Sequence, residues 1–225
     1  MSLATLKMIL PDFNQISGSE KSQYPIALSM CFYKSDRFDK TKHVDPLFKQ
    51  NKTEADFLIF TDDESIVDLL PERCKVYLTN QPLEGWHKHF YRYAGAKFSN
   101  KYDWVWFTGT DNPWLAHRLK LMNLAKERFI RIITQCSNAT NITANCALRG
   151  SELRNLYLTL KKGISDVRYP NAEWHCDDKF LRDYLKKVDE PVLHINHSEF
   201  AGWSINEDHV LWIMNNRPGS VIVNP

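Results

Sequence analysis

The sequence predicts an α/β fold in which a mostly parallel central sheet is flanked by helices. The chain has 225 residues, of which 43% are hydrophobic, enough to bury one substantial core. Four short apolar segments alternate with helical stretches within about 110 residues, which is typical of a parallel sheet. No repeat, low-complexity tract or linker divides the chain. We therefore expect residues 1–225 to form one domain, with residues 1–24 as a loosely ordered arm.

The four predicted strands are short apolar segments that end in polar or turn-forming residues. Segment 26–33 has a small-residue centre, and segment 55–60 is followed by Thr61-Asp62-Asp63-Glu64. A short helix is expected at 65–70, because Pro71 stops it. The remaining two segments are 74–78 and 104–108. Between these, residues 86–98 place aromatic and alanine side chains at near-helical spacing, with Lys88, Arg92 and Lys97 interleaved.

The second half of the chain continues the alternation of helices and strands. An amphipathic helix is expected after Pro113, then a strand at 129–134, a polar loop at 137–145 and a short apolar piece at 146–148. Ser151 is a candidate cap for a helix that ends near Gly163. A further helix is predicted from Trp174, a strand at 192–195 and a last helix near 207–214.

The stretch 103–115 delivers a carboxylate to the end of a central strand. Residues 104–108 are aromatic or β-branched, as in a strand buried on both faces. Gly109 ends this strand, and Asp111 follows in a turn before Pro113. Ligands of open α/β sheets bind at the carboxyl ends of the strands. Asp111 is therefore either a ligand-binding residue or a cap of the helix after Pro113.

Composition excludes several classes of protein. The net charge of +2 and pI near 8.2 permit a polyanionic partner without requiring one. No apolar run is long enough to span a membrane, and no secretory leader is visible. The five cysteines are an odd number without a Cys-x-x-Cys pair, which indicates reduced thiols in a cytoplasmic compartment. If the protein is viral, that compartment is the host cytoplasm.

Acidic and histidine residues follow several of the predicted strands. The common phosphate-binding glycine loops and the Gly-x-Ser-x-Gly elbow are absent. Carboxylates with one or two imidazoles suit Mn²⁺ or Mg²⁺, and such a metal neutralises a diphosphate leaving group. The residues expected to meet at one edge of the sheet are Asp62, Asp63, Asp111, Asp177, Asp178, His194 and His197.

Four segments of the chain resemble those of the GT-A nucleotide-sugar glycosyltransferases, which have a Rossmann-like α/β fold. Residues 103–115 resemble the segment in which this family carries an Asp-x-Asp motif for a divalent cation. Here the motif is Gly109-Thr110-Asp111, so only its last Asp is carried over. Residues 145–150 are similar to the segment that forms part of the donor-sugar and acceptor floor.

The third segment, Trp174-His175-Cys176-Asp177-Asp178, resembles the Trp-His-Asp-Glu segment of the retaining family-6 galactosyl- and N-acetylgalactosaminyltransferases. The match treats Cys176 as an insertion and places Asp178 where those enzymes carry their candidate nucleophile. Residues 193–203 look like a C-terminal stretch whose histidine completes the metal site in other GT-A families.

The resemblance implies a transferase that moves a sugar from a nucleoside diphosphate, expected to be UDP, to a hydroxyl of a glycan or protein. Asp111 and His197 would hold Mn²⁺ or Mg²⁺, and Asp177 or Asp178 would orient the donor sugar or stabilise oxocarbenium-like charge. Lys88 or Arg92 would assist the diphosphate, and Trp203 would stack on a sugar or base ring. The remaining expected donor-site residues are Asp62, Asp63, Thr110 and Asn145.

Each of these assignments has a structural alternative. Asp62 and Asp63, like Asp177 and Asp178, also suit helix N-termini. His194, inside an apolar run, suits a hydrogen-bonded structural role better than His197 does.

Three other functions remain open at this stage. A viral enzyme that glycosylates hydroxymethylated DNA bases would use the basic segments 118–131 and 179–187. The other two are a catalytically silent sugar-nucleotide-binding domain and a metal-dependent nuclease or phosphatase.

Overall fold

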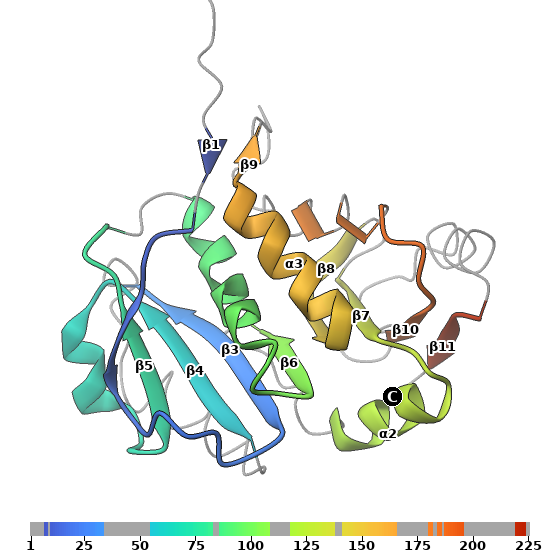
Figure 1. The fold of residues 1–225 in the computed structure, drawn as a ribbon, viewed down its shortest axis with the longest axis horizontal. Helices are drawn as coiled ribbons and strands as arrows, with labels where there is room; N and C mark the ends of the chain where they lie inside the picture. The colour runs from blue at the N-terminus through green and yellow to red at the C-terminus, as the bar shows by residue number, and fades with distance from the viewer. Residues whose placement is uncertain are drawn as a thin grey trace, which may run out of the picture.

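The fold was analysed in a computed structural model of the chain. The structure describes residues 7–8, 10–33, 55–82, 86–108, 118–137, 141–165, 180–181, 184–185, 187–195 and 219–223. Within these residues, it contains one nine-stranded sheet and a separate two-stranded pair (Figure 1). The predicted class, a single α/β domain with a mostly parallel sheet between helices, is confirmed.

The central sheet has the strand order β11-β10-β7-β8-β6-β3-β4-β5-β2. All its strands run in the same direction except β2 and β8, which are antiparallel to their neighbours. The first five in chain order are β2 (Asn14–Ser17), β3 (Ile26–Phe32), β4 (Asp56–Thr61), β5 (Cys74–Leu78) and β6 (Trp104–Phe107). They are followed by β7 (Ile132–Ser137), β8 (Asn141–Arg149), β10 (Val192–Ile195) and β11 (Val221–Val223).

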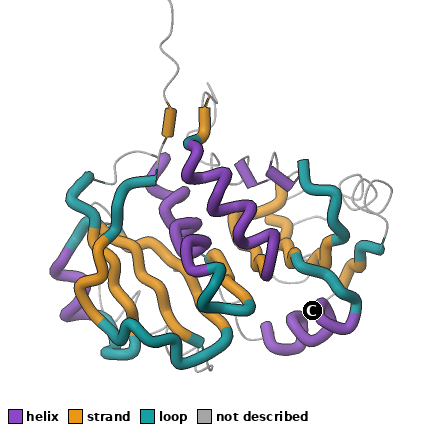
Figure 2. Tube along the Cα trace, in the orientation of Figure 1, coloured by secondary structure: helices purple, strands orange, loops and turns teal. Residues whose placement is uncertain are grey.

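Helices cover both faces of the sheet, because strands such as β3 are apolar on both sides. Alternate residues of β3 belong to two different core clusters, with Ala27 in one and Leu28 in the other. The first cluster includes residues of η4 (Trp86–Phe98) and α3 (Gly150–Lys162), which cross the strands side by side (Figure 2). The second includes residues of η3 (Glu64–Leu69) and α2 (Arg118–Glu127).

The helix predicted at 86–98 is present as η4, but with 3₁₀ geometry. It lies close over β3 at Gly95, where an added Cβ would come within 2.7 Å of the Ser29 Cβ. The Ser29 hydroxyl donates a hydrogen bond to the Arg92 carbonyl. A tertiary contact to the sheet therefore acts directly on the backbone of this helix.

The segment expected to be a loose arm is partly built into the sheet. Residues 14–17 form β2, the edge strand beside β5. Residues 21–23 fasten to a buried ion pair, in which Lys75 Nζ lies 2.7 Å from Asp56 Oδ2. Lys75 donates to the Lys21 carbonyl, and Asp56 accepts from the Gln23 N–H. These hydrogen bonds offset part of the cost of burying the two charges. Because residues 14–17 pair with β5 and residues 21–23 contact the ion pair, the expectation of a loose arm was wrong for this part of the chain.

The polar loop expected at 137–145 is also wrong, because β7 extends to Ser137 and β8 begins at Asn141. β8 pairs antiparallel with both β6 and β7, in the middle of the sheet. The polar residues in the first half of β8 do not have the pattern of a strand, so only residues 146–148 were identified as a short apolar segment in the sequence. Similarly, Ser151 is not the cap of α3, which begins at Gly150 after Arg149 without a side-chain cap.

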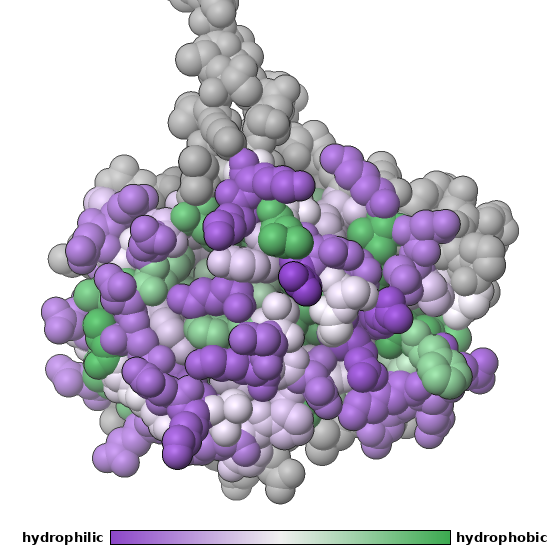
Figure 3. Space-filling model, viewed as in Figure 1, coloured by the Kyte–Doolittle hydropathy of each residue, from purple (hydrophilic) through white to green (hydrophobic). Residues whose placement is uncertain are grey.

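The two remaining strands, β1 (Lys7–Met8) and β9 (Ile164–Ser165), pair antiparallel beyond the end of α3. Hydrophobic side chains on the face viewed in Figure 3 appear as small separate patches among polar ones. In the part of the chain that the structure describes, no helix is long and apolar enough to cross a membrane.

Candidate functional site

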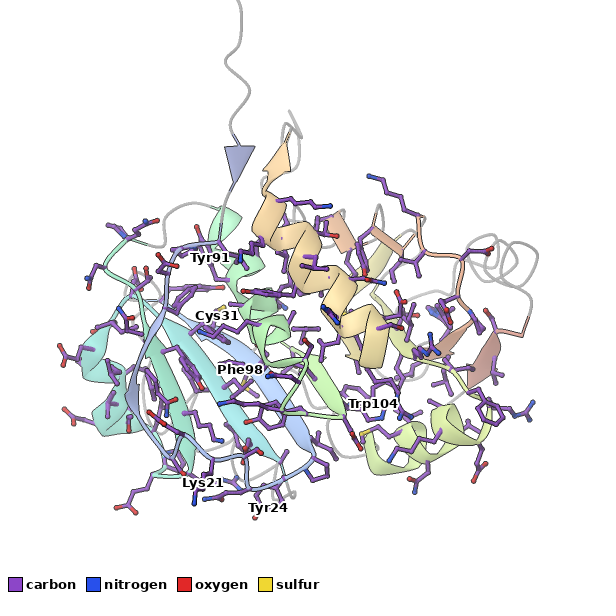
Figure 4. The ribbon with its side chains drawn as sticks, viewed as in Figure 1. Lys21, Tyr24, Cys31, Tyr91, Phe98 and Trp104 are labelled. Carbon is purple, nitrogen blue, oxygen red and sulfur yellow. The ribbon has the colours of Figure 1, made fainter. Side chains whose placement is uncertain are left out.

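The parallel strands end along one side of the sheet, which we call the carboxyl edge. The β3, β4 and β5 ends are in register, with Phe32 opposite Thr61 and Thr61 opposite Leu78. β6, β7 and β10 end on the same side because they run in the same direction. In Figure 4, Cys31 and Tyr91 lie toward this side, and Lys21, Tyr24 and Trp104 lie toward the opposite one. The carboxyl edge is where ligands of open α/β sheets bind.

Hydroxyl side chains end the four strands that were predicted first. They are Tyr33, Thr61, Thr79 and Thr108, all largely buried. Thr61 Oγ1 accepts a hydrogen bond from the Asp63 N–H, and Thr79 Oγ1 accepts one from the Gln81 N–H. They were not among the predicted site residues, although each comes at or just after the end of an apolar segment, and this position was the available signal.

Asp62 and Asp63 follow β4 at the carboxyl edge, as predicted, and both are partly buried. Asp63 Oδ1 accepts hydrogen bonds from the Ser65 N–H at 3.1 Å and the Ser65 hydroxyl at 2.7 Å. This carboxylate therefore caps η3, the structural role that was the alternative for it. Asp62 is not the capping residue, so it remains the stronger candidate of the two for contact with a ligand.

A cluster of aromatic rings includes residues that are close in sequence to two of the predicted site segments. The Tyr93 ring lies 5.2 Å from the ring of Phe107, the last residue of β6, and 5.7 Å from that of Phe180. Phe180 also contacts Phe90, at 5.3 Å. Phe107 is two residues before Gly109-Thr110-Asp111, and Phe180 is two residues after Asp177-Asp178. The described residues that border these two segments are thus packed against the same part of η4.

Arg92 lies next to Tyr93 in η4 and is partly exposed. Burial raises the pKa of the Cys146 thiol, and the positive charge of Arg92 is near enough to oppose that rise. Cys146 is opposite Phe107 in the register of β8 and β6. The positive charge of Arg92 therefore lies within electrostatic range of Cys146, beside the end of β6.

The other predicted site residues are less completely described. Lys88 lies in η4 and Asn145 in β8, one residue before Cys146, but their side chains are not among those described. Six lie outside the described residues altogether: Thr110, Asp111, Asp177, Asp178, His197 and Trp203.

His194 is a buried residue of β10 whose role agrees with the structural interpretation. Its Nδ1 lies 2.9 Å from Thr134 Oγ1 on β7, and the two residues are opposite each other in register. The ring thus bridges two neighbouring strands within the sheet.

No group of three His, Cys, Asp or Glu that could hold a metal occurs among the described residues. The predicted metal ligands Asp111 and His197 lie outside them. Asp111 follows β6 and His197 follows β10, two strands that end at the carboxyl edge. In the sheet, β7 and β8 lie between these two strands.

The fold and the carboxyl edge define an α/β protein of the kind that binds ligands at its strand ends. No protein-family model matches the chain, and no curated protein matches it. Several solved structures resemble it at low identity. One, a provisional nucleotide-diphospho-sugar transferase from Desulfovibrio desulfuricans G20, is 14% identical, with a TM-score of 0.49 over 76% of this chain and 79% of that one.

Two further structures show a similar degree of likeness. The 4-diphosphocytidyl-2C-methyl-D-erythritol synthase from Anaerococcus prevotii DSM 20548 is 13% identical, with a TM-score of 0.49 over 85% of this chain and 95% of that one. Rv0371c from Mycobacterium tuberculosis H37Rv is 10% identical, with a TM-score of 0.45 over 77% and 88% of the two chains. Similarity at this level does not assign an activity to the chain.

Proposed function

We propose that the protein is a glycosyltransferase that moves a sugar from a nucleoside diphosphate to a hydroxyl of a glycan or protein. The proposed nucleoside diphosphate is UDP. The observation that supports this is the packing of Phe107, Tyr93 and Phe180. This packing anchors the segments before Asp111 and after Asp178 to one helix, with Arg92 beside them. A donor site needs a cation for the diphosphate and a carboxylate for the sugar. In this proposal Arg92 of η4 supplies the cation, and Asp177 or Asp178, which come shortly before Phe180 in the sequence, supplies the carboxylate.

In this proposal, Arg92 and Lys88 interact with the diphosphate, and Asp62 with the nucleoside. Asp177 or Asp178 orients the donor sugar or stabilises positive charge that develops on it, as carboxylates do in glycoside chemistry. Thr110, Asn145 and Trp203 complete the donor pocket. Asp111 and His197 hold Mn²⁺ or Mg²⁺, which when bound neutralises the leaving diphosphate.

The test is the thermal stability of the purified protein with UDP, GDP, CDP and their sugars, each with and without Mn²⁺. A ligand that binds only the folded state raises the melting temperature, by an amount that grows with its concentration. We expect one nucleotide to raise it only when Mn²⁺ is present, and Asp111→Asn to abolish that rise. The matched control is Asp103→Asn. Asp103 is an exposed carboxylate directly before β6, and its substitution should leave the rise in melting temperature intact.

The outcomes separate the proposed function from its alternatives. If no nucleotide raises the melting temperature, the glycosyltransferase proposal is wrong, and cleavage of DNA in Mg²⁺ would then identify a nuclease. If UDP binds but no UDP-sugar is turned over in the presence of glycan, protein and hydroxymethylated-DNA acceptors, the chain is a silent sugar-nucleotide-binding domain. Transfer to DNA alone would identify the viral DNA-modifying alternative.

A further inference from the structure

The turn between α2 and β7 exposes an aromatic side chain in a strained backbone conformation. Phe129 is 87% exposed, more than either of the other large hydrophobic residues on the described surface, Ile16 and Leu158. Its φ is 58°, and it is the only residue other than glycine with positive φ among the described residues. Both properties are unfavourable for phenylalanine, because the left-handed region crowds its Cβ and water surrounds its ring.

The strain follows from how α2 ends. The Ile130 N–H donates to the Ala125 carbonyl at 2.8 Å, and the Phe129 N–H donates to the Lys126 carbonyl at 3.1 Å. These two bonds form a Schellman motif, which requires a left-handed residue at the position of Phe129. Ala125 and Ile130 are both fully buried, so the motif is held in place from the core. Glycine is the usual residue at this position.

Exposed basic residues flank Phe129 in the sequence. Lys126, Arg128 and Arg131 are exposed, against the single exposed acid Glu127. Arg131 Nη1 lies 3.4 Å from Glu190 Oε1 in a partly exposed pair, so its charge is offset in part. The turn therefore combines an apolar tip with positive charge.

We propose that residues 126–131, the α2–β7 turn, form a docking surface for an anionic lipid membrane. Phe129 enters the interface between headgroups and acyl chains, and the basic residues interact with anionic headgroups. Stable membrane anchoring takes two signals, such as an apolar group and a basic patch, and this turn supplies one of each kind. A single-stranded nucleic acid fits less well, because it stacks on a row of rings, and Phe129 is the one strongly exposed aromatic of the described surface.

The place of this turn in the fold suits such a role. It precedes β7, so it lies at the edge where the parallel strands begin, opposite the carboxyl edge. Docking through this surface would leave the carboxyl edge open to solvent and ligands. The inference does not depend on the proposed activity.

The test is co-sedimentation of the full chain with vesicles of equal parts phosphatidylcholine and phosphatidylglycerol, at low and high salt. We expect binding at low salt, weaker binding at high salt and none to vesicles of phosphatidylcholine alone. Phe129→Gly should weaken binding about tenfold or more, because the variant lacks the aromatic ring that the wild type buries in the membrane interface. Its melting temperature should equal or exceed that of the wild type, because glycine relieves the strain. Loss of binding cannot then be ascribed to unfolding.

Two further variants complete the design. Leu158→Ala removes an exposed hydrophobic side chain on α3 and should leave binding unchanged. The double variant Lys126→Gln, Arg128→Gln should remove most of the salt dependence.

The proposal is overturned if the wild type does not bind the anionic vesicles, or if Phe129→Gly binds them as tightly as the wild type does. It is also overturned if single-stranded DNA binds through Phe129 and the vesicles do not.

Discussion

Glu152 is a buried acid in the first turn of α3, only 4% exposed. Its Oε1 accepts a hydrogen bond from Asn155, and its Oε2 has no hydrogen-bond partner among the residues that the structure describes. Burial raises the pKa of this carboxyl, and the charge of Glu190 raises it further, against smaller opposing effects of Asn155 and Arg131. The folded protein therefore holds the Glu152 proton more tightly than the unfolded chain does.

The sign of this effect predicts a pH dependence. Because the folded-state pKa is raised, the stabilisation is present below the unfolded pKa of about 4.3 and is lost as pH rises through the folded pKa. Glu152→Gln has no charge to bury, so its melting temperature relative to the wild type should increase from acid to neutral pH. Thermal melts of the variant and the wild type at acid and at neutral pH measure this difference in melting temperature. Glu127→Gln, at an exposed acid, is the control, and a difference that does not change with pH would contradict the prediction.

At the level of single residues, the sequence predicted positions better than roles. Asp63 was expected at the carboxyl edge and lies there, but its carboxylate caps η3. His194 was expected to be structural, and the hydrogen bond to Thr134 confirms it. The hydroxyl residues at the strand ends were missed, because threonine and tyrosine carry no chemical signal by themselves.

The contact between η4 and β3 depends on the missing side chain of Gly95. An added Cβ there would meet Ser29 Oγ, and it would lie 2.7 Å from Ser29 Cβ and 3.4 Å from Val105 Cγ1. Ser29 is fully buried in the middle of β3, so it cannot move aside cheaply.

Gly95→Ala is therefore expected to reduce the free energy of unfolding by about 1–3 kcal/mol through overpacking. Urea denaturation measures this change. The control is Asn100→Ala, an exposed position just after η4, where a change within about 0.5 kcal/mol is expected. Equal stability of Gly95→Ala and the wild type would show that η4 does not lie this close to the sheet.

Elements with a clear local pattern were predicted well. Segment 74–78 is β5 with the same bounds, and the helix before Gly163 is α3. β2 and most of β8 were missed, because β2 is partly exposed and three of the five residues 141–145 are polar. Their strand conformation depends on neighbours that are distant in the sequence, β5 for one and β6 and β7 for the other.

On the scale of the whole molecule, the described cysteine side chains are part of the core. Cys31, Cys74 and Cys146 are buried cysteines outside any disulfide. Burial raises the pKa of Cys74 to about 12, against a smaller opposing effect of Arg73. It raises that of Cys146 as well. Reactivity requires the thiolate, so these three thiols should be inert in the folded protein.

Alkylation with iodoacetamide at neutral pH, followed by mapping of the modified residues by mass spectrometry, tests this prediction. Cys31, Cys74 and Cys146 should react only as fast as the whole domain unfolds, and urea should accelerate all three together. Rapid labelling of Cys146 in the folded protein would contradict the packing of β8 in the centre of the sheet.

The sequence by itself determined the α/β class, the parallel strands β3, β4, β5 and β6, and the edge at which functional residues are expected. These features follow from local signals, such as apolar segments and turn residues at their ends, which act over a few residues. Tertiary structure alone decided that β8 lies between β6 and β7, that β2 closes the far edge and that Tyr93 joins Phe107 to Phe180. The physical reason is that strand pairing and ring packing gain their free energy from residues far apart in the chain, which no local pattern encodes.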